Sequence, residues 1–115
     1  METTRVLEKR AVEGDDDALF RLGYRLAFGR RRSKPEDWAL IFRLWRAAAE
    51  LENRRACYLV GVSYAQGQGV RRSLQRAVEW FRKGARLGYP AAQSNLGYCY
   101  RDGKGVPQSG AKAVE

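Results

Sequence analysis

The sequence contains no histidine, only two cysteines and no long apolar run, and each absence excludes a class of function. Histidine is the commonest general base and metal ligand, and Cys57 and Cys99 form no CxxC pair, so we expect no metal site. No nucleophile–base pair or paired carboxylates stand in a recognisable motif, so we expect no catalytic residues, no cofactor and no enzymatic activity. No apolar stretch reaches the roughly 18 residues that a membrane-spanning helix needs.

The residues that are present are typical of a soluble globular domain. The chain has 115 residues, of which 44% are hydrophobic and 30% charged, enough for one domain with a modest core. The N-terminal stretch METTRVLEKRAVEGDDD contains no apolar segment of signal-peptide length, which predicts a cytoplasmic location. The net charge of +9 favours acidic partners, among which an acidic protein, an anionic lipid and a nucleic acid are alternatives.

An internal repeat is the strongest pattern in the sequence. ACYLVGVSYAQGQGV (Ala56–Val70) and AQSNLGYCYRDGKGV (Ala92–Val106) share alanine, glycine, tyrosine and a final Gly-x-Gly-Val at the same places. ALFRLGYRLAFG (Ala18–Gly29) keeps a weaker form of the same frame. The segments between these copies, Trp38–Ala56 and Leu74–Ala92, also align with each other. Self-similarity of this kind is typical of stacked repeat proteins.

The spacing of the apolar residues inside each half-repeat predicts helices that alternate in direction. Gly23 and Gly61 recur at one register inside these helices, where a glycine costs about 1 kcal/mol relative to alanine. We therefore expect close helix contacts there, with Trp45 and Phe81 among the large partners that fill the adjacent space. Pro35 and Pro90 are expected in the first turns of their helices. The expected helices cover residues 3–13, 16–28, 35–51, 54–66, 72–87 and 90–101, with a further helix start at 109–115.

The pattern A-x-x-x-L-G-x-x-Y-x-x-G-x-G-V, followed by A-x-x-W-F-x-x-[AG]-A-x-x-G, resembles the Sel1-like repeat, a relative of the tetratricopeptide repeat. The resemblance implies an all-α fold, a right-handed α-α superhelix or solenoid of antiparallel helix pairs. It also implies a non-enzymatic scaffold for protein–protein interaction. Residues 1–115 are interpreted as a single domain, made up of a capping helix at 3–13, a degenerate repeat at 16–51, a repeat at 54–87 and a truncated repeat at 90–115.

Cysteine-rich relatives of this family carry disulfides, and a few of them bind β-lactams. Cys57 occupies one of their cysteine positions, but the partner position holds Ala49, so no disulfide is expected. A β-lactam-like small molecule remains a remote alternative ligand. The last repeat stops before its second helix is complete, which predicts either a frayed C-terminal tail or self-association through an uncapped C-terminal end.

The geometry of tetratricopeptide repeats implies a concave groove lined by one face of the first helix of each repeat. Tyrosine and arginine are enriched among residues that dominate binding energy, so this face is the expected partner-binding surface. The alternative is that some of its aromatic residues pack inside the solenoid. The predicted groove residues are Phe20, Tyr24, Arg55, Tyr58, Val62, Gln66, Ser94, Tyr98 and Arg101.

Two equivalent loops are rich in basic residues and predict a basic edge, which would bind polyanions or simply keep the loops solvated. Nucleic acid is disfavoured, because no helix combines a basic face with an aromatic stacking platform. The Gly67-x-Gly69 and Gly103-x-Gly105 loops lack the preceding strand and the Gly-Lys-Ser/Thr of a phosphate-binding loop, which favours a structural turn. The basic edge consists of Arg30, Arg31, Arg32, Lys34, Arg71 and Arg72.

Overall fold

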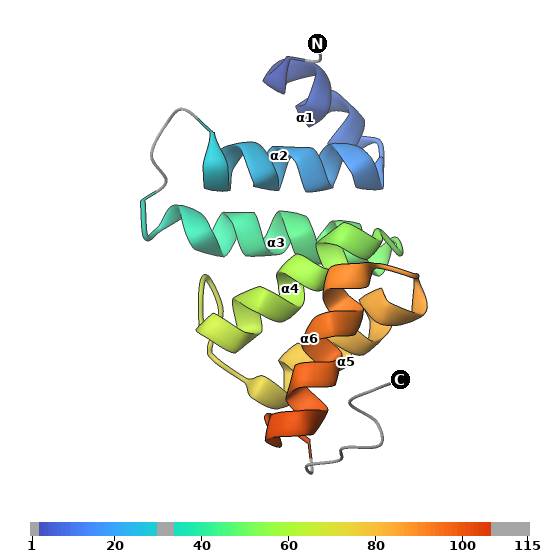
Figure 1. Ribbon diagram of the computed structural model, residues 1–115. Helices are drawn as coiled ribbons and strands as arrows, with labels where there is room; N and C mark the ends of the chain where they lie inside the picture. Colours follow the sequence, from blue (N-terminus) through green and yellow to red (C-terminus); the bar gives the residue numbers. More distant parts are fainter. Residues whose placement is uncertain (1–2, 30–33, 107–115) are drawn as a thin grey trace.

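The computed structural model describes residues 3–29 and 34–106, and all regular structure within them is helical (Figure 1). The prediction of an all-α fold is confirmed, and each predicted helix boundary lies within two residues of the observed one. Arg30, Arg31, Arg32 and the expected helix start at 109–115 lie outside the described residues. The helices are α1 (Thr4–Val12), α2 (Asp16–Phe28), α3 (Asp37–Glu50), α4 (Arg54–Gln66), α5 (Leu74–Arg86) and α6 (Pro90–Asp102).

Short polar side chains determine where most of the helices begin. Thr3, Asp15, Asn53 and Ser73 each accept a hydrogen bond from the backbone N–H three residues later, which satisfies an amide that the helix itself leaves unpaired. Helix α6 begins with Pro90, as predicted.

Helix α3 begins differently, and the expectation that Pro35 lies in its first turn is wrong. Pro35 lies in the turn before the helix, which begins at Asp37. The Asp37 carboxylate accepts a hydrogen bond from the Lys34 backbone N–H at 2.9 Å and so closes that turn.

The helices pack in chain order as a stack of antiparallel pairs. Helix α2 pairs with α3 and α4 pairs with α5, while α3 packs against α4 and α6 packs against both α5 and α4 (Figure 1). Apolar side chains from α2 to α6 form one continuous core. Helix α1 covers the outer side of α2, where Leu7 is fully buried against Ala18 and Leu22. The result is an elongated helical solenoid of 46 × 27 × 20 Å.

Glycines allow the two helices of each pair to approach closely. A Cβ atom added at Gly61 would lie 2.5 Å from the ring of Phe81, and one added at Gly23 would lie 2.5 Å from Trp45 Nε1. The prediction of close contacts at this register is therefore confirmed. The close packing of Trp45 against α2 leaves its indole N–H buried without a hydrogen-bond partner in the described structure, which is unfavourable.

The Gly-x-Gly-Val segments are turns that attach each repeat to the preceding one. Gly67 and Gly103 end α4 and α6 in the left-handed conformation, with φ of 69° in both cases. The second glycine then packs against the first turn of an earlier helix. A Cβ atom at Gly105 would lie 2.5 Å from the Leu74 carbonyl oxygen, and Gly69 lies against the Trp38 carbonyl in the same way. This packing supports the interpretation as structural turns.

Candidate functional site

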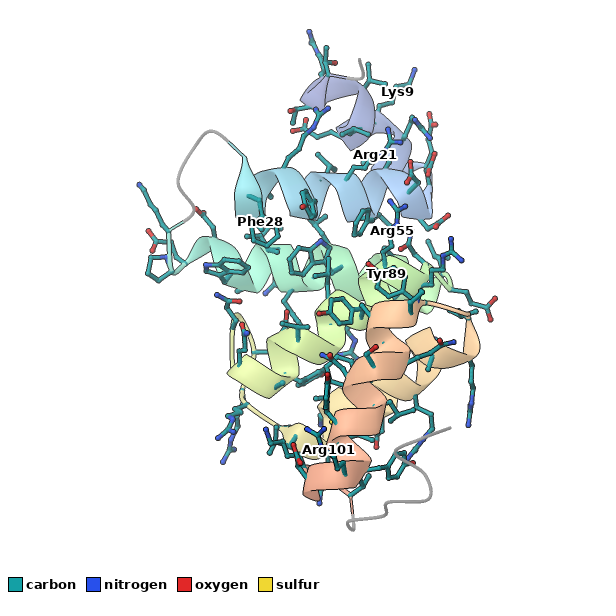
Figure 2. All side chains as sticks on the ribbon, in the orientation of Figure 1. Lys9, Arg21, Phe28, Arg55, Tyr89 and Arg101 are labelled. Atoms are coloured by element: carbon teal, nitrogen blue, oxygen red, sulfur yellow. The ribbon has the colours of Figure 1, made fainter. Side chains whose placement is uncertain are left out.

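Two hollows lie next to each other along the first helices of the repeats. The first, which we call the arginine hollow, has a volume of about 520 Å³ and lies between α2 and the beginnings of α4 and α6. Figure 2 shows Arg21 on α2, Arg55 in the first turn of α4 and Tyr89 just before α6. The lining residues of the arginine hollow are Phe20, Arg21, Tyr24, Arg25, Arg55 and Tyr89.

The second hollow, which we call the tyrosine hollow, has a volume of about 470 Å³ and lies between α4, α5 and α6. Tyr98 is 53% exposed, and the guanidinium of Arg101 lies 4.7 Å from the centre of its ring. Arg101 also donates a hydrogen bond to Asp102, which raises the pKa of the Arg101 side chain and holds its charged guanidinium in place beside the ring. An aromatic ring and a fixed cation thus face the solvent together.

A pair of tyrosines separates the two hollows. Tyr58 lines the tyrosine hollow and Tyr89 lines the arginine hollow, and their ring centres lie 5.5 Å apart. Tyr58 also packs against Phe81 at 5.9 Å, so this boundary is supported from the core. The two hollows therefore meet at this contact between two rings. We call the two hollows together the groove.

The structure brings most of the predicted groove residues into these hollows. Phe20, Tyr24 and Arg55 lie in the arginine hollow, although Phe20 is largely buried and contributes mainly to the core. Ser94 is exposed on α6 and lines neither hollow. The predicted residues in the tyrosine hollow are Tyr58, Val62, Gln66, Tyr98 and Arg101.

Sequence reasoning missed several lining residues. Arg21 and Arg25 directly follow Phe20 and Tyr24, so the repeated aromatic–arginine pair one helical turn apart was a signal that the sequence contained. Tyr89 lies between helices, where the repeat pattern places no tyrosine in the earlier copies. It lines the hollow only because α6 folds back against α4.

The basic edge is less separate from the groove than predicted. Arg72 lines the tyrosine hollow, and its Nε donates a hydrogen bond to the Ala65 carbonyl oxygen at 3.1 Å. Arg71 is exposed and, together with Arg72 and Arg76, lines a further hollow of about 450 Å³. Lys34 is exposed in the turn before α3.

Both cysteines are free and buried, and Cys99 is among the residues that line the tyrosine hollow. Cys57 is fully buried, and its thiol donates a long hydrogen bond to the Ala49 carbonyl oxygen at 3.7 Å. Burial raises the pKa of Cys57 and of Cys99, so both remain thiols at neutral pH. Within residues 3–29 and 34–106, no three metal-binding side chains gather, and none of the helices has the length and apolar character needed to span a membrane.

Comparison with known proteins identifies the family. The model of the Sel1 repeat matches residues 16–41, 54–89 and 90–115, which together make up more than half of the chain. The chain belongs to the Sel1 repeat family. Both the resemblance expected from the sequence and the helical solenoid are thereby confirmed. Sel1 repeats generally act as non-catalytic scaffolds for protein–protein interaction.

Solved Sel1 repeat structures superpose closely on this one. A Sel1 repeat protein from Oxalobacter formigenes is 32% identical, with a TM-score of 0.89, and the match covers 99% of this chain and 86% of that one. The protective antigen c5321 of uropathogenic Escherichia coli is 35% identical, with a TM-score of 0.90 over 99% of this chain and 24% of its own. Helicobacter pylori cysteine-rich protein B, at 24% identity and a TM-score of 0.72, shares the fold.

A curated relative comes from a plant. The protein HRD3B of Arabidopsis thaliana, a component of an ERAD-associated E3 ubiquitin-protein ligase, is 29% identical over 106 residues. The match covers 91% of this Sel1 repeat chain but only 16% of HRD3B.

Proposed function

We propose that this Sel1 repeat chain is a non-enzymatic scaffold that holds a partner protein or peptide in the groove. The observation that carries the proposal is the pair of adjoining open hollows, lined by exposed tyrosine and arginine side chains. Tyr24 is 50% exposed and Tyr98 is 53% exposed. When exposed aromatic side chains bind a partner, their apolar surface is removed from water, which favours binding. Tyrosine and arginine are also prominent among binding hot spots.

The relatives support this role. HRD3B is by its description a component of a ligase assembly, which is consistent with repeats that make protein contacts. The partner that fits this chain best is acidic, because the chain carries a net charge of +9 and the groove contains arginines from α2, α4 and α6.

Selection from a displayed library of random peptides tests the proposal. Tyr98→Ala removes an exposed ring of the tyrosine hollow and is expected to abolish enrichment of the peptides that the natural chain selects. Ser94→Ala is the matched control, because Ser94 lies one turn earlier on α6 but outside both hollows. Unchanged helical circular dichroism in both variants shows that the fold is intact. Equal enrichment by the Tyr98→Ala variant would refute a binding role for the groove.

A second candidate function is a basic adaptor for polyanions. The specific observation that favours it is the hollow that Arg71, Arg72 and Arg76 line next to the groove. Such binding depends on released counterions and therefore weakens steeply with salt. Retention on a heparin column should fall in the Arg71→Gln, Arg76→Gln double variant, whereas retention equal to that of the natural chain would remove this candidate.

A further inference from the structure

The arginine hollow is lined by positively charged side chains from both α2 and α4. Three of its six lining residues are arginines, and none is a carboxylate. Arg21 forms an ion pair with Asp17 at 3.0 Å, and Arg25 donates a hydrogen bond to the Thr4 hydroxyl at 3.3 Å. These contacts hold the two side chains along α2. Neither contact involves Arg55, the third arginine of the hollow.

Arg55 differs from the two arginines of α2. It is exposed in the first turn of α4, and within the described part of the chain it makes no ion pair. The positive end of the α4 dipole lies beside it and adds to the attraction for an anion. Its guanidinium therefore keeps its planar set of donors available for a ligand, and this geometry matches a carboxylate through two parallel hydrogen bonds.

The remaining walls of the hollow are aromatic. Phe20 and Tyr24 lie with ring centres 5.9 Å apart, and Tyr89 closes the side next to the tyrosine hollow. Aromatic walls that a bound peptide covers exclude water and lower the local dielectric constant, which strengthens an ion pair formed between peptide and hollow. They also offer contact surface for the methylene groups of a glutamate or for a neighbouring apolar residue.

We propose that the arginine hollow selects an acidic side chain, a glutamate or an aspartate, of the peptide that the groove holds. Arg55 is the main contact, Arg21 and Arg25 line the opposite wall, and the peptide continues past Tyr89 and Tyr58 into the tyrosine hollow. The inference rests on the proposed function. It adds the chemistry that the first hollow recognises and the position of the acidic residue relative to the tyrosine pair.

Fluorescence polarisation with two labelled peptides tests the inference. One peptide alternates glutamate with tyrosine, and the other replaces every glutamate with glutamine, so that the two differ in charge and hardly in shape. The natural chain should bind the glutamate peptide more tightly by about tenfold or more, the range for hydrogen bonds to charged groups. Arg55→Gln should remove most of this preference, and Arg55→Lys should restore only part of it, because a lysine lacks the planar fork.

Arg43→Gln is the matched control. Arg43 is exposed on α3 and lines neither hollow, and its replacement changes the net charge by the same amount. If Arg43→Gln weakens binding as much as Arg55→Gln does, the attraction is general and the inference is overturned. Equal affinity of the natural chain for both peptides overturns it as well. The scaffold proposal is judged separately by the library selection, so Tyr98-dependent peptides without acidic residues would leave the scaffold standing and this inference refuted.

Discussion

Replacement of Gly61 by alanine tests whether close helix contact holds the solenoid together. The new Cβ would lie 2.5 Å from Phe81 Cε1 and 2.6 Å from Cδ1, about 1 Å closer than carbon atoms normally approach. Phe81 is 3% exposed in the core, so the ring has little room to move away. Overpacking of this kind costs about 1–3 kcal/mol, while alanine gains about 1 kcal/mol in helix propensity. Because the buried ring cannot move away, the cost should lie at the upper end of this range, so we expect Gly61→Ala to lower the free energy of unfolding by about 2 kcal/mol.

Gly84 provides the matched comparison within the same repeat. A Cβ there would lie 3.0 Å from Ala92 Cβ and 3.4 Å from Cys57 Cβ, which is tight but can be relieved by a small shift. The equivalent position in the preceding repeat is Ala48, which is fully buried. The gain in propensity should offset this crowding, so Gly84→Ala should change stability by less than about 0.5 kcal/mol.

Urea unfolding followed by circular dichroism measures both variants. A smaller side chain at position 81 should relieve the clash, so Gly61→Ala combined with Phe81→Leu should be more stable than the sum of the single changes, by about 1 kcal/mol. If Gly61→Ala is as stable as the natural chain, or if Gly84→Ala is the more damaging of the two, the packing argument is wrong.

Three further predictions concern polar groups. Trp45→Phe removes an indole N–H that has no hydrogen-bond partner, which offsets part of the loss of ring volume. The melting temperature should therefore fall less in Trp45→Phe than in Trp45→Ala. Equal decreases in the two variants would contradict this. Asn53→Ala removes both the α4 cap and the hydrogen bond to Asp16 at 3.0 Å, and should cost about 1–2 kcal/mol in urea unfolding, whereas Asn53→Ser should retain the cap and part of the stability. The hydrogen bond from Arg10 lowers the pKa of Asp15, so the stabilisation by the charged Asp15 is present above the ordinary value of 3.8 and is lost as the pH falls through the folded-state pKa. The melting temperature of Asp15→Asn should therefore fall less on acidification than that of the natural chain. An equal fall in both proteins would refute the assignment.

The fold was predictable because the same structural requirements, a close helix contact and a tight turn, recur in successive repeats of the sequence. Gly23 and Gly61 recur opposite Trp45 and Phe81, so a costly residue at a fixed register was enough to indicate close helix contact. The Gly-x-Gly-Val turn recurs in the same way. Helix boundaries followed from the periodic segments and from the glycines and prolines between them, which act locally.

The groove was only partly predictable, because its lining comes from the way the helices stack. The register of the repeat indicated Tyr58 and Tyr98, since both lie on the face of the first helix that recurs from one repeat to the next. Tyr89 lies outside the repeated frame, and its place in the arginine hollow depends on how α6 returns to α4. Phe20 lies on the predicted groove face of α2 but is largely buried, because its ring packs into the hydrophobic core.

The central claim is tested most directly by an NMR titration. A peptide from the library is added to the isotope-labelled chain, and the changes in backbone chemical shift are mapped on the structure. A scaffold that holds its partner in the groove predicts the largest changes at Tyr24, Arg55, Tyr58 and Tyr98, with little change on the outer faces of α3 and α5. Changes concentrated instead around Arg43 on α3 or Glu79 on α5 would contradict a groove-binding scaffold.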